Sequence, residues 1–180
     1  NINITVIPQG FYNLSTLKLN MRDTVRAYLR NSAFPFTITD SSIAVIDSVT
    51  FTGQFNFVNS LSGNYYIVVK HRNTIETWSR IGGEPMNSGI TMNYDFTTSA
   101  NKAYGNNLTQ VNSAPLKFAI YSGDTNQDGA IDASDLSTIE NDVSNSTGGY
   151  VSTDLTGDDF VDGSDLSIAE NNSALGVNVI

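Results

Sequence analysis

The chain has 180 residues, of which 39% are apolar and 10% aromatic, so it can bury a core as one ordinary domain or two small ones. It has no cysteine, which excludes disulfides, thiolate zinc sites and cysteine nucleophiles, and no apolar run of about eighteen residues that would span a membrane. Its net charge of −9 argues against nucleic acid as a partner.

The first residue and the composition both suggest an exported protein. The sequence begins at Asn1 without an initiator methionine, a basic stretch or an apolar signal core, which we interpret as a mature, processed product. Asn, Ser, Thr, Gly and Tyr are abundant, whereas Lys and Glu are scarce, a composition typical of secreted bacterial β-proteins. We therefore expect a secreted protein, extracellular or at the cell surface.

Basic and acidic residues are segregated along the chain. All nine Lys and Arg lie between Lys18 and Lys117, whereas twelve of the eighteen acids lie between Asp124 and Glu170, a stretch that we call the acidic segment. The first 120 residues carry nine positive and six negative charges, a net +3, and the last sixty carry −12 without a basic residue. Because uncompensated carboxylates repel one another, compaction of the acidic segment requires cations, and the two parts should attract and pack together.

Patterns typical of strands fill the first 120 residues. Ile2, Ile4 and Val6 alternate with polar residues, which predicts a strand. The polar, Asn-rich region Ser99–Pro115 predicts a long loop or an irregular excursion. Runs rich in β-branched and aromatic residues predict further strands at Leu14–Leu19, Thr24–Arg30, Ile43–Thr50, Gln54–Val58, Tyr65–His71, Thr74–Ser79, Thr91–Phe96 and Leu116–Tyr121. Together they predict a mainly β protein whose residues 1–120 form an antiparallel, transthyretin- or immunoglobulin-like β-sandwich domain.

One stretch of these strands has a recognisable order. A strand ending in Ala27-Tyr28-Leu29-Arg30 is followed by Val45 and Val49, by Phe55-Asn56-Phe57, by a Gly63-Asn64 turn and by Tyr65–His71. This order, from Val25 to Trp78, resembles the transthyretin-like (collagen-adhesin B-type) sandwiches that occur as repeats in bacterial surface proteins. The resemblance covers about half of the predicted sandwich.

The acidic segment is an internal repeat with a period of thirty residues, in which Asp124 aligns with Asp154. Each copy has the spacing of an EF-hand-type calcium loop, which supplies oxygens from positions 1, 3, 5, 7 (a backbone carbonyl), 9 and 12. Hard oxygen ligands at this spacing suit calcium. The predicted ligands of two ions are Asp124, Asn126, Asp128, the Ala130 carbonyl, Asp132 and Asp135 in the first loop, and Asp154, Thr156, Asp158, the Phe160 carbonyl, Asp162 and Asp165 in the second.

Each loop leads into a predicted helix. The Asp at position 9 can cap a helix that starts there, with the Asp at position 12 close to its free amides. Apolar residues at helical spacing follow in both copies: Leu136, Ile139 and Val143 in the first, and Leu166, Ala169 and Leu175 in the second. We also expect the apolar residues at position 8, Ile131 and Val161, to pair the two loops.

Two such loop–helix units in register resemble a dockerin domain, which would occupy residues 121–180. The resemblance implies a small helical domain that folds on calcium, and in cellulosomes dockerins bind cohesins. In the second loop, Thr156 replaces the usual Asp or Asn at position 3 and Asp159 replaces Gly at position 6, so the second site should be the weaker one. The pairs Ala133-Ser134 and Gly163-Ser164 are not followed by a basic residue, so the resemblance carries over the fold and the metal but not the cohesin partner.

The sequence offers little for catalysis. His71 is the single histidine, and only six acids lie outside the acidic segment. Nothing pairs two of those acids across a cleft, as a glycosidase requires. Trp78 with Tyr65 and Tyr66 could stack sugars, but their spacing favours core packing. We therefore expect no enzyme.

Two functions are compatible with these patterns. The first is a non-catalytic structural subunit of an extracellular or cell-surface assembly, such as a fibre, tube or surface layer, stabilised by calcium and associating with other copies of itself. Strand addition by one terminus, Asn1–Ile7 or Gly176–Ile180, could build such a homopolymer, unless Ile2–Ile7 is the first strand of its own sandwich and the tail folds back on its own domain. The alternative is a dockerin-type module that docks a cohesin-like protein.

Overall fold

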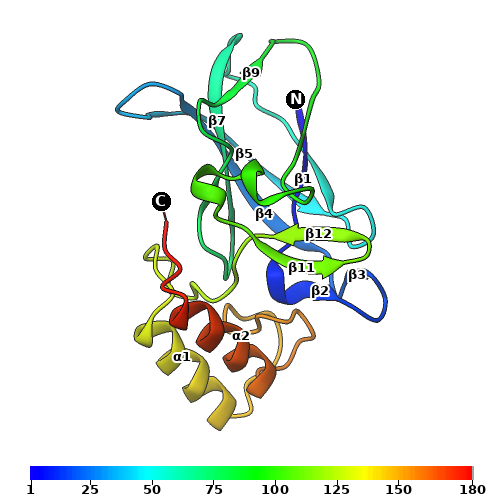
Figure 1. Ribbon diagram of the computed structural model, residues 1–180, viewed down its shortest axis with the longest axis vertical. Helices are drawn as coiled ribbons and strands as arrows, with labels where there is room; N and C mark the ends of the chain where they lie inside the picture. Colours follow the sequence, from blue (N-terminus) through cyan, green and yellow to red (C-terminus); the bar gives the residue numbers. More distant parts are fainter. Residues whose placement is uncertain (180) are drawn as a thin grey trace.

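The computed structural model describes residues 1–179 and shows a mainly β, sandwich-like fold with two helices at one end (Figure 1). A five-stranded sheet has the order β5-β4-β7-β8, with β9 also paired to β7, and a three-stranded sheet has the order β10-β1-β6. The strands are β1 (Ile2–Thr5), β2 (Tyr12–Asn13), β3 (Lys18–Leu19), β4 (Asp23–Asn31), β5 (Ile38–Ile46), β6 (Thr52–Phe55), β7 (Gly63–His71), β8 (Thr77–Trp78), β9 (Glu84–Met86), β10 (Met92–Asp95), β11 (Thr109–Ser113) and β12 (Leu116–Ala119). The helices are α1 (Ala133–Ser144) and α2 (Gly163–Ala174), with short 3-10 turns η1 (Gln9–Phe11), η2 (Ala100–Lys102) and η3 (Tyr104–Asn106).

The core lies between the two larger sheets. Alternate residues of β1, β4 and β7 point inward, as the period of two predicted, and Ile2, Val25 and Val69 are fully buried there. At about 25 cal/mol per Å² of apolar surface removed from water, this burial is the main stabilising term. The sandwich that the sequence predicted is therefore present.

Several details differ from the predicted strands. β1 pairs parallel with β10, from Ile2–Met92 to Thr5–Asp95, so the sandwich is mixed rather than wholly antiparallel. β5 begins earlier than expected and ends at Ile46, because Asp47 accepts hydrogen bonds from the amides of Val49 and Thr50 and closes a turn. The predicted strand Leu14–Leu19 is mostly a turn, and the expected loop Ser99–Pro115 contains strand β11.

Both helices begin as predicted. Asp132 and Asp162 are N-caps that accept hydrogen bonds from the amides of Ser134 and Ser164, and each forms a capping box with the Asp three residues later. Ile139 and Ala169 are buried between the helices. Leu175 was expected to join them but is 71% exposed, because α2 has already ended at Ala174.

The two loops do not pair with each other, which corrects the expectation for Ile131 and Val161. The Ile131 amide donates to the Val177 carbonyl (2.9 Å), and the Val161 amide donates to the Thr147 carbonyl (2.9 Å). The first loop therefore pairs with the segment that follows α2, and the second loop pairs with the segment that follows α1. Ile131 packs with Ile75 and Val177, apart from the cluster that holds Val161.

Both termini are used inside the fold. β1 is the central strand of the three-stranded sheet, with β10 on one side and β6 on the other. At the other end, the Val179 amide donates to the Gly129 carbonyl (2.8 Å), and Val177 is buried. Of the two alternatives, pairing within the chain is therefore the correct one for residues 1–7 and 176–179, and these residues are not free to add a strand to a neighbour. Ile180 lies outside the described residues.

The acidic segment packs closely against the sandwich at η1. The hydrogen atoms of Gly10 face the Leu155 carbonyl so closely that a Cβ there would lie 2.2 Å from that oxygen. The ring of Phe11 lies against Gly157, and Asn20 donates to the Thr156 carbonyl (2.8 Å). The two parts thus pack together, and the first loop adds to this contact through Ile131, which packs on Ile75.

We expect Gly10→Ala to destabilise the protein by about 1–3 kcal/mol, because the added methyl group overpacks a backbone contact that cannot yield without moving the second loop. Gly163→Ala is the matched control, since nothing lies within 4 Å of a Cβ at that first position of α2. Thermal melting in calcium would measure both. Equal melting temperatures for the two variants would show that the sandwich and the second loop are not in contact at Gly10.

Candidate functional site

The first acidic loop is wound around two buried carboxylates. Asp124 is 1% exposed and Asp135 is fully buried. The Asp135 Oδ1 accepts from the amides of Thr125 (2.8 Å) and Asn126 (3.2 Å), and its Oδ2 accepts from the Asp132 amide (3.1 Å). Gly129 at position 6 has φ 95°, a conformation that glycine adopts without strain. The chain thus brings the first and last predicted ligands of this loop into its interior.

The second loop repeats this arrangement. Asp165 is fully buried and accepts from the amides of Thr156 (2.9 Å) and Asp162 (2.8 Å). Asp154 is also fully buried and accepts from the Gly157 (2.7 Å) and Asp158 (3.2 Å) amides. Asp159 takes the left-handed conformation, with φ 68°, that its place at position 6 requires.

The two position-7 carbonyls are left available. Strand pairing engages the carbonyls of position 6 (Gly129 and Asp159) and the amides of position 8. Within residues 1–179, the Ala130 and Phe160 carbonyls accept no backbone hydrogen bond outside regular elements. A calcium loop needs this oxygen as a ligand, so the backbone of both loops fits the ion.

Asp124 gives the sharpest test of whether the first loop fits a cation. Its Oδ1 is buried and has no hydrogen-bond partner. Burial, followed by repulsion from Asp135 and Asp128, raises the pKa of this carboxyl to about 6. A buried carboxylate oxygen without a donor is costly, and a divalent cation would compensate it. Burial also raises the pKa of Asp165 in the second loop.

The remaining predicted ligands lie at the loop surface and are held by local hydrogen bonds. Asn126 Nδ2 donates to Asp128 Oδ2 (2.9 Å), and the Oδ1 atoms of Asp132 and Asp162 cap their helices. Over residues 1–179, no three carboxylate or imidazole groups converge as a ready-made cluster. Side-chain rotation of residues such as Asn126 and Asp128 would therefore have to accompany binding.

A residue of the sandwich that the sequence analysis missed reaches the second loop. Arg72 donates from Nε to Asp23 Oδ2 (2.9 Å) and lies with Nη2 3.3 Å from Asp154 Oδ2. Asn73 donates from Nδ2 to the Asp154 carbonyl (2.8 Å). Asp154, the first predicted ligand of the second loop, thus already faces a cation. The charge difference between the two parts predicted attraction, but no pattern pointed to this arginine.

His71, the single histidine of the chain, belongs to the same buried network. It is 2% exposed, with Nε2 2.9 Å from Asp23 Oδ2 and Nδ1 3.0 Å from Asn73 Oδ1. Because both ring nitrogens are engaged, neither is placed to take a proton from a nucleophile.

The carboxyl at the centre of this network is Asp23. Besides His71 and Arg72, the Tyr150 hydroxyl of the acidic segment donates to it (2.6 Å). Burial by itself would raise the pKa of Asp23, but the hydrogen bonds from His71, Tyr150 and Arg72 outweigh it and hold that pKa below its ordinary value of 3.8. The five other acids outside the acidic segment bind local partners: Asp40 with Asn59, Asp47 with Thr50, Glu76 with Trp78, Glu84 with Arg80 and Asp95 with Thr97.

We expect Asp23→Asn to lower the free energy of unfolding by about 3 kcal/mol at pH 7, because it removes the charge that His71, Arg72 and Tyr150 share in a buried site. The lowered pKa of Asp23 means that its contribution is present above pH 3.8 and is lost as the pH falls further. The difference in unfolding free energy between the variant and the parent should therefore become smaller at acidic pH. Urea unfolding at several pH values would measure it, with Glu170→Gln on the exposed face of α2 as control. A difference between variant and parent that does not change with pH would contradict the ionic role.

Comparisons with known proteins identify a shared fold. No protein-family model matches the chain, and no curated protein does. Among solved structures, the chain is similar to one from a C-terminal interface mutant of a type II cohesin–X-dockerin complex of Acetivibrio cellulolyticus, with 13% identity over 95% of this chain and 93% of the other and a TM-score of 0.53. An N-terminal interface mutant of the same complex matches at 13% identity over 95% and 90%, with a TM-score of 0.47.

At this identity the first match establishes similarity of fold alone. Because it covers 95% of the chain, it extends over the sheets and the helical segment together. None of the helices within residues 1–179 is long and apolar enough to cross a membrane.

Proposed function

We propose that this chain is a non-catalytic docking module that works outside the cell or at its surface. In this proposal, residues 1–120 form a sandwich domain and residues 121–180 form a dockerin-like domain that holds two calcium ions. The observation that carries the proposal is the pair of acidic loops in register, each with a buried first ligand and an available position-7 carbonyl. The fold shared with a chain of a cohesin–X-dockerin complex supports it.

Calcium has a clear physical task in this proposal. Two ions would bring four positive charges to the acidic segment and reduce its net charge from −12 to −8. The first ion would be held by Asp124, Asn126, Asp128, Asp132, Asp135 and the Ala130 carbonyl, and the second by the six corresponding groups from Asp154 to Asp165. Because these ligands are not preorganised in the unfolded chain, binding free energy becomes folding free energy.

The loop–helix pair favours the dockerin side of such a complex. The matched complex contains both a cohesin and an X-dockerin, so either role is compatible with the fold alone. The two helices with their acidic loops support the dockerin role, and the partner is then a cohesin-like protein. The outer faces of α1 and α2 expose Ser134, Ser164 and Glu140 but no basic residue, so the contact would be polar and uncharged or acidic on this side.

A self-associating structural subunit is the second candidate. It is supported by large apolar side chains that the sandwich leaves exposed: Phe34 at 86%, Val58 at 83% and Ile81 at 74%. Such side chains are available for contact with another copy of the chain. Association would then use side-chain surfaces, since both terminal strands are paired within the chain.

Calcium should raise the melting temperature, and chelation should lower it. Free calcium at about 100 times its dissociation constant would stabilise each site by about 2.7 kcal/mol. Asp124→Ala should reduce the calcium-induced shift more than Asp154→Ala, because Arg72 already compensates Asp154. Differential scanning calorimetry with and without chelator would measure both, with exposed Glu140→Ala as control. Identical melting curves in calcium and chelator would refute the calcium assignment.

The docking role is tested with the two halves of the matched complex as probes. Surface plasmon resonance should show that the chain binds the type II cohesin in calcium and loses it in chelator, because the helices that present the contact depend on the loops. Binding to the X-dockerin instead would reverse the assigned role. If neither binds and sedimentation shows concentration-dependent growth, the structural subunit is the better account.

A further inference from the structure

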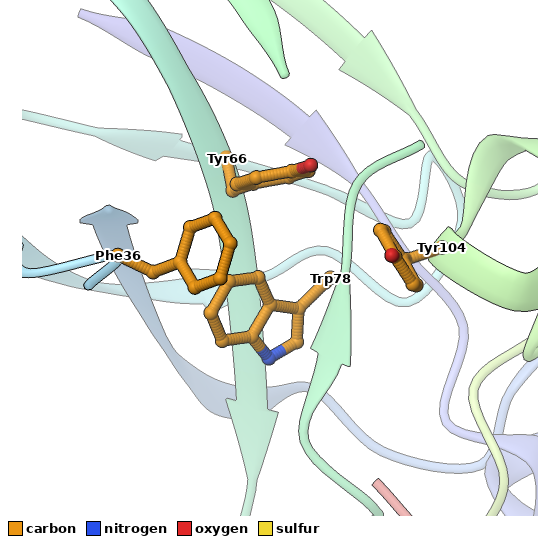
Figure 2. A pocket seen from close by; sticks show the side chains of 4 residues that line it. All are labelled: Phe36, Tyr66, Trp78 and Tyr104. Atoms are coloured by element: carbon orange, nitrogen blue, oxygen red, sulfur yellow. The ribbon is translucent and has the colours of Figure 1, made fainter. Parts of the chain in front are cut away.

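Four aromatic side chains form a hollow on the outer face of the five-stranded sheet (Figure 2). Tyr66 comes from β7, Trp78 from β8, Phe36 from the loop between β4 and β5, and Tyr104 from η3. Of the three aromatic residues expected to pack in the core, Tyr65 lies between the two sheets, Tyr66 is also buried but outside that cluster, and Trp78 is half-buried. Tyr66 and Trp78 lie on the opposite side of the sheet from Tyr65, because successive residues of a strand point to opposite sides.

The rings hold one another in place without a ligand. Tyr66 lies at the centre, with ring centroids 5.4 Å from Trp78, 5.9 Å from Phe36 and 6.0 Å from Tyr104, all edge to face. Its hydroxyl accepts a hydrogen bond from the Gly82 amide (3.2 Å). Because these side chains are already ordered, ligand binding loses little free energy to ordering them.

An ion pair lies beside Trp78, one of the four rings that line the hollow. The guanidinium carbon of Arg30 lies 4.9 Å from the ring centroid of Trp78, and its Nη2 lies 3.7 Å from Glu76 Oε1. Trp78 Nε1 donates to the same Glu76 oxygen (2.9 Å). The site thus contains its own cation against the indole, so a cationic ligand would meet a like charge, while Glu76 disfavours an anion.

We propose that this hollow binds a neutral saccharide ring. A sugar offers apolar C–H faces to the half-buried rings of Phe36, Trp78 and Tyr104, and hydroxyl groups to the carboxylate of Glu76 beside Trp78. The volume, about 410 Å³, lies in the range of small-ligand pockets. Both polar contacts that the described residues make to Glu76 use Oε1, so Oε2 remains an acceptor that a sugar hydroxyl can satisfy. A polyproline segment also suits aromatic grooves, but proline has no N–H to donate there.

The chain offers a direct optical test, because Trp78 is its single tryptophan. Fluorescence of the full chain in calcium would be titrated with cellohexaose, xylohexaose and chitohexaose. At least one should cause a saturable change in the emission of Trp78. Tyr104→Ala should weaken that binding about tenfold or more, whereas Ile43→Ala, half-exposed on β5 outside the hollow, should not change it.

Trp78→Phe keeps an aromatic face and, followed by calorimetry, should retain weaker binding, which separates loss of stacking from loss of folding. The proposal is overturned if none of the three oligosaccharides gives a saturable change up to millimolar concentration. It is also overturned if Tyr104→Ala, folded by its melting curve, binds as the parent does, or if only a proline-rich peptide binds. None of these outcomes depends on calcium binding or on docking to a cohesin.

Discussion

Arg72 lies between two buried carboxylates, Asp23 of the sandwich and Asp154 of the acidic segment. Its side chain is 12% exposed and the two carboxylates are almost completely buried, so each charge would be expensive alone. Among the ion pairs of residues 1–179, Arg72–Asp154 is the one that joins the sandwich to the acidic segment. The placement of the second loop, and with it of the helices, depends on this contact and on the close approach at Gly10.

This contact makes the two loops electrostatically unequal. Asp154 has an arginine and several backbone amides as partners, whereas Asp124 has a buried oxygen with none and a pKa raised to about 6 by burial and its acidic neighbours. The second loop is therefore held partly by the sandwich, and the first has more to gain from an added cation. From Thr156 and Asp159 the sequence led to the same expectation of a weaker second site, and Arg72 adds an independent reason for it.

Local patterns predicted local structure well and distant contacts poorly. The N-caps Asp132 and Asp162, the inward positions of β1 and the left-handed Asp159 follow from short-range geometry, so the sequence was sufficient for them. The pairing of Ile131 with Val177 joins residues far apart in the chain, and no periodicity encodes it. For the same reason the aromatic hollow was misread: Tyr66 and Trp78 have core-like spacing, and only the sheet decides which face is the core.

The edges of the sheets limit how this chain can contact others. β1 is enclosed by its neighbours, and the tail pairs with the first loop. β5 is an edge strand of nine residues with exposed Ile38, Ile43 and Val45, the kind of edge that invites strand addition. Yet Asp40 turns inward from it and accepts from the Asn59 amide and the Ser60 hydroxyl, and the Asn56 amide donates to Ser42 Oγ. The following chain thus covers part of this edge, which leaves less of its backbone open to strand addition.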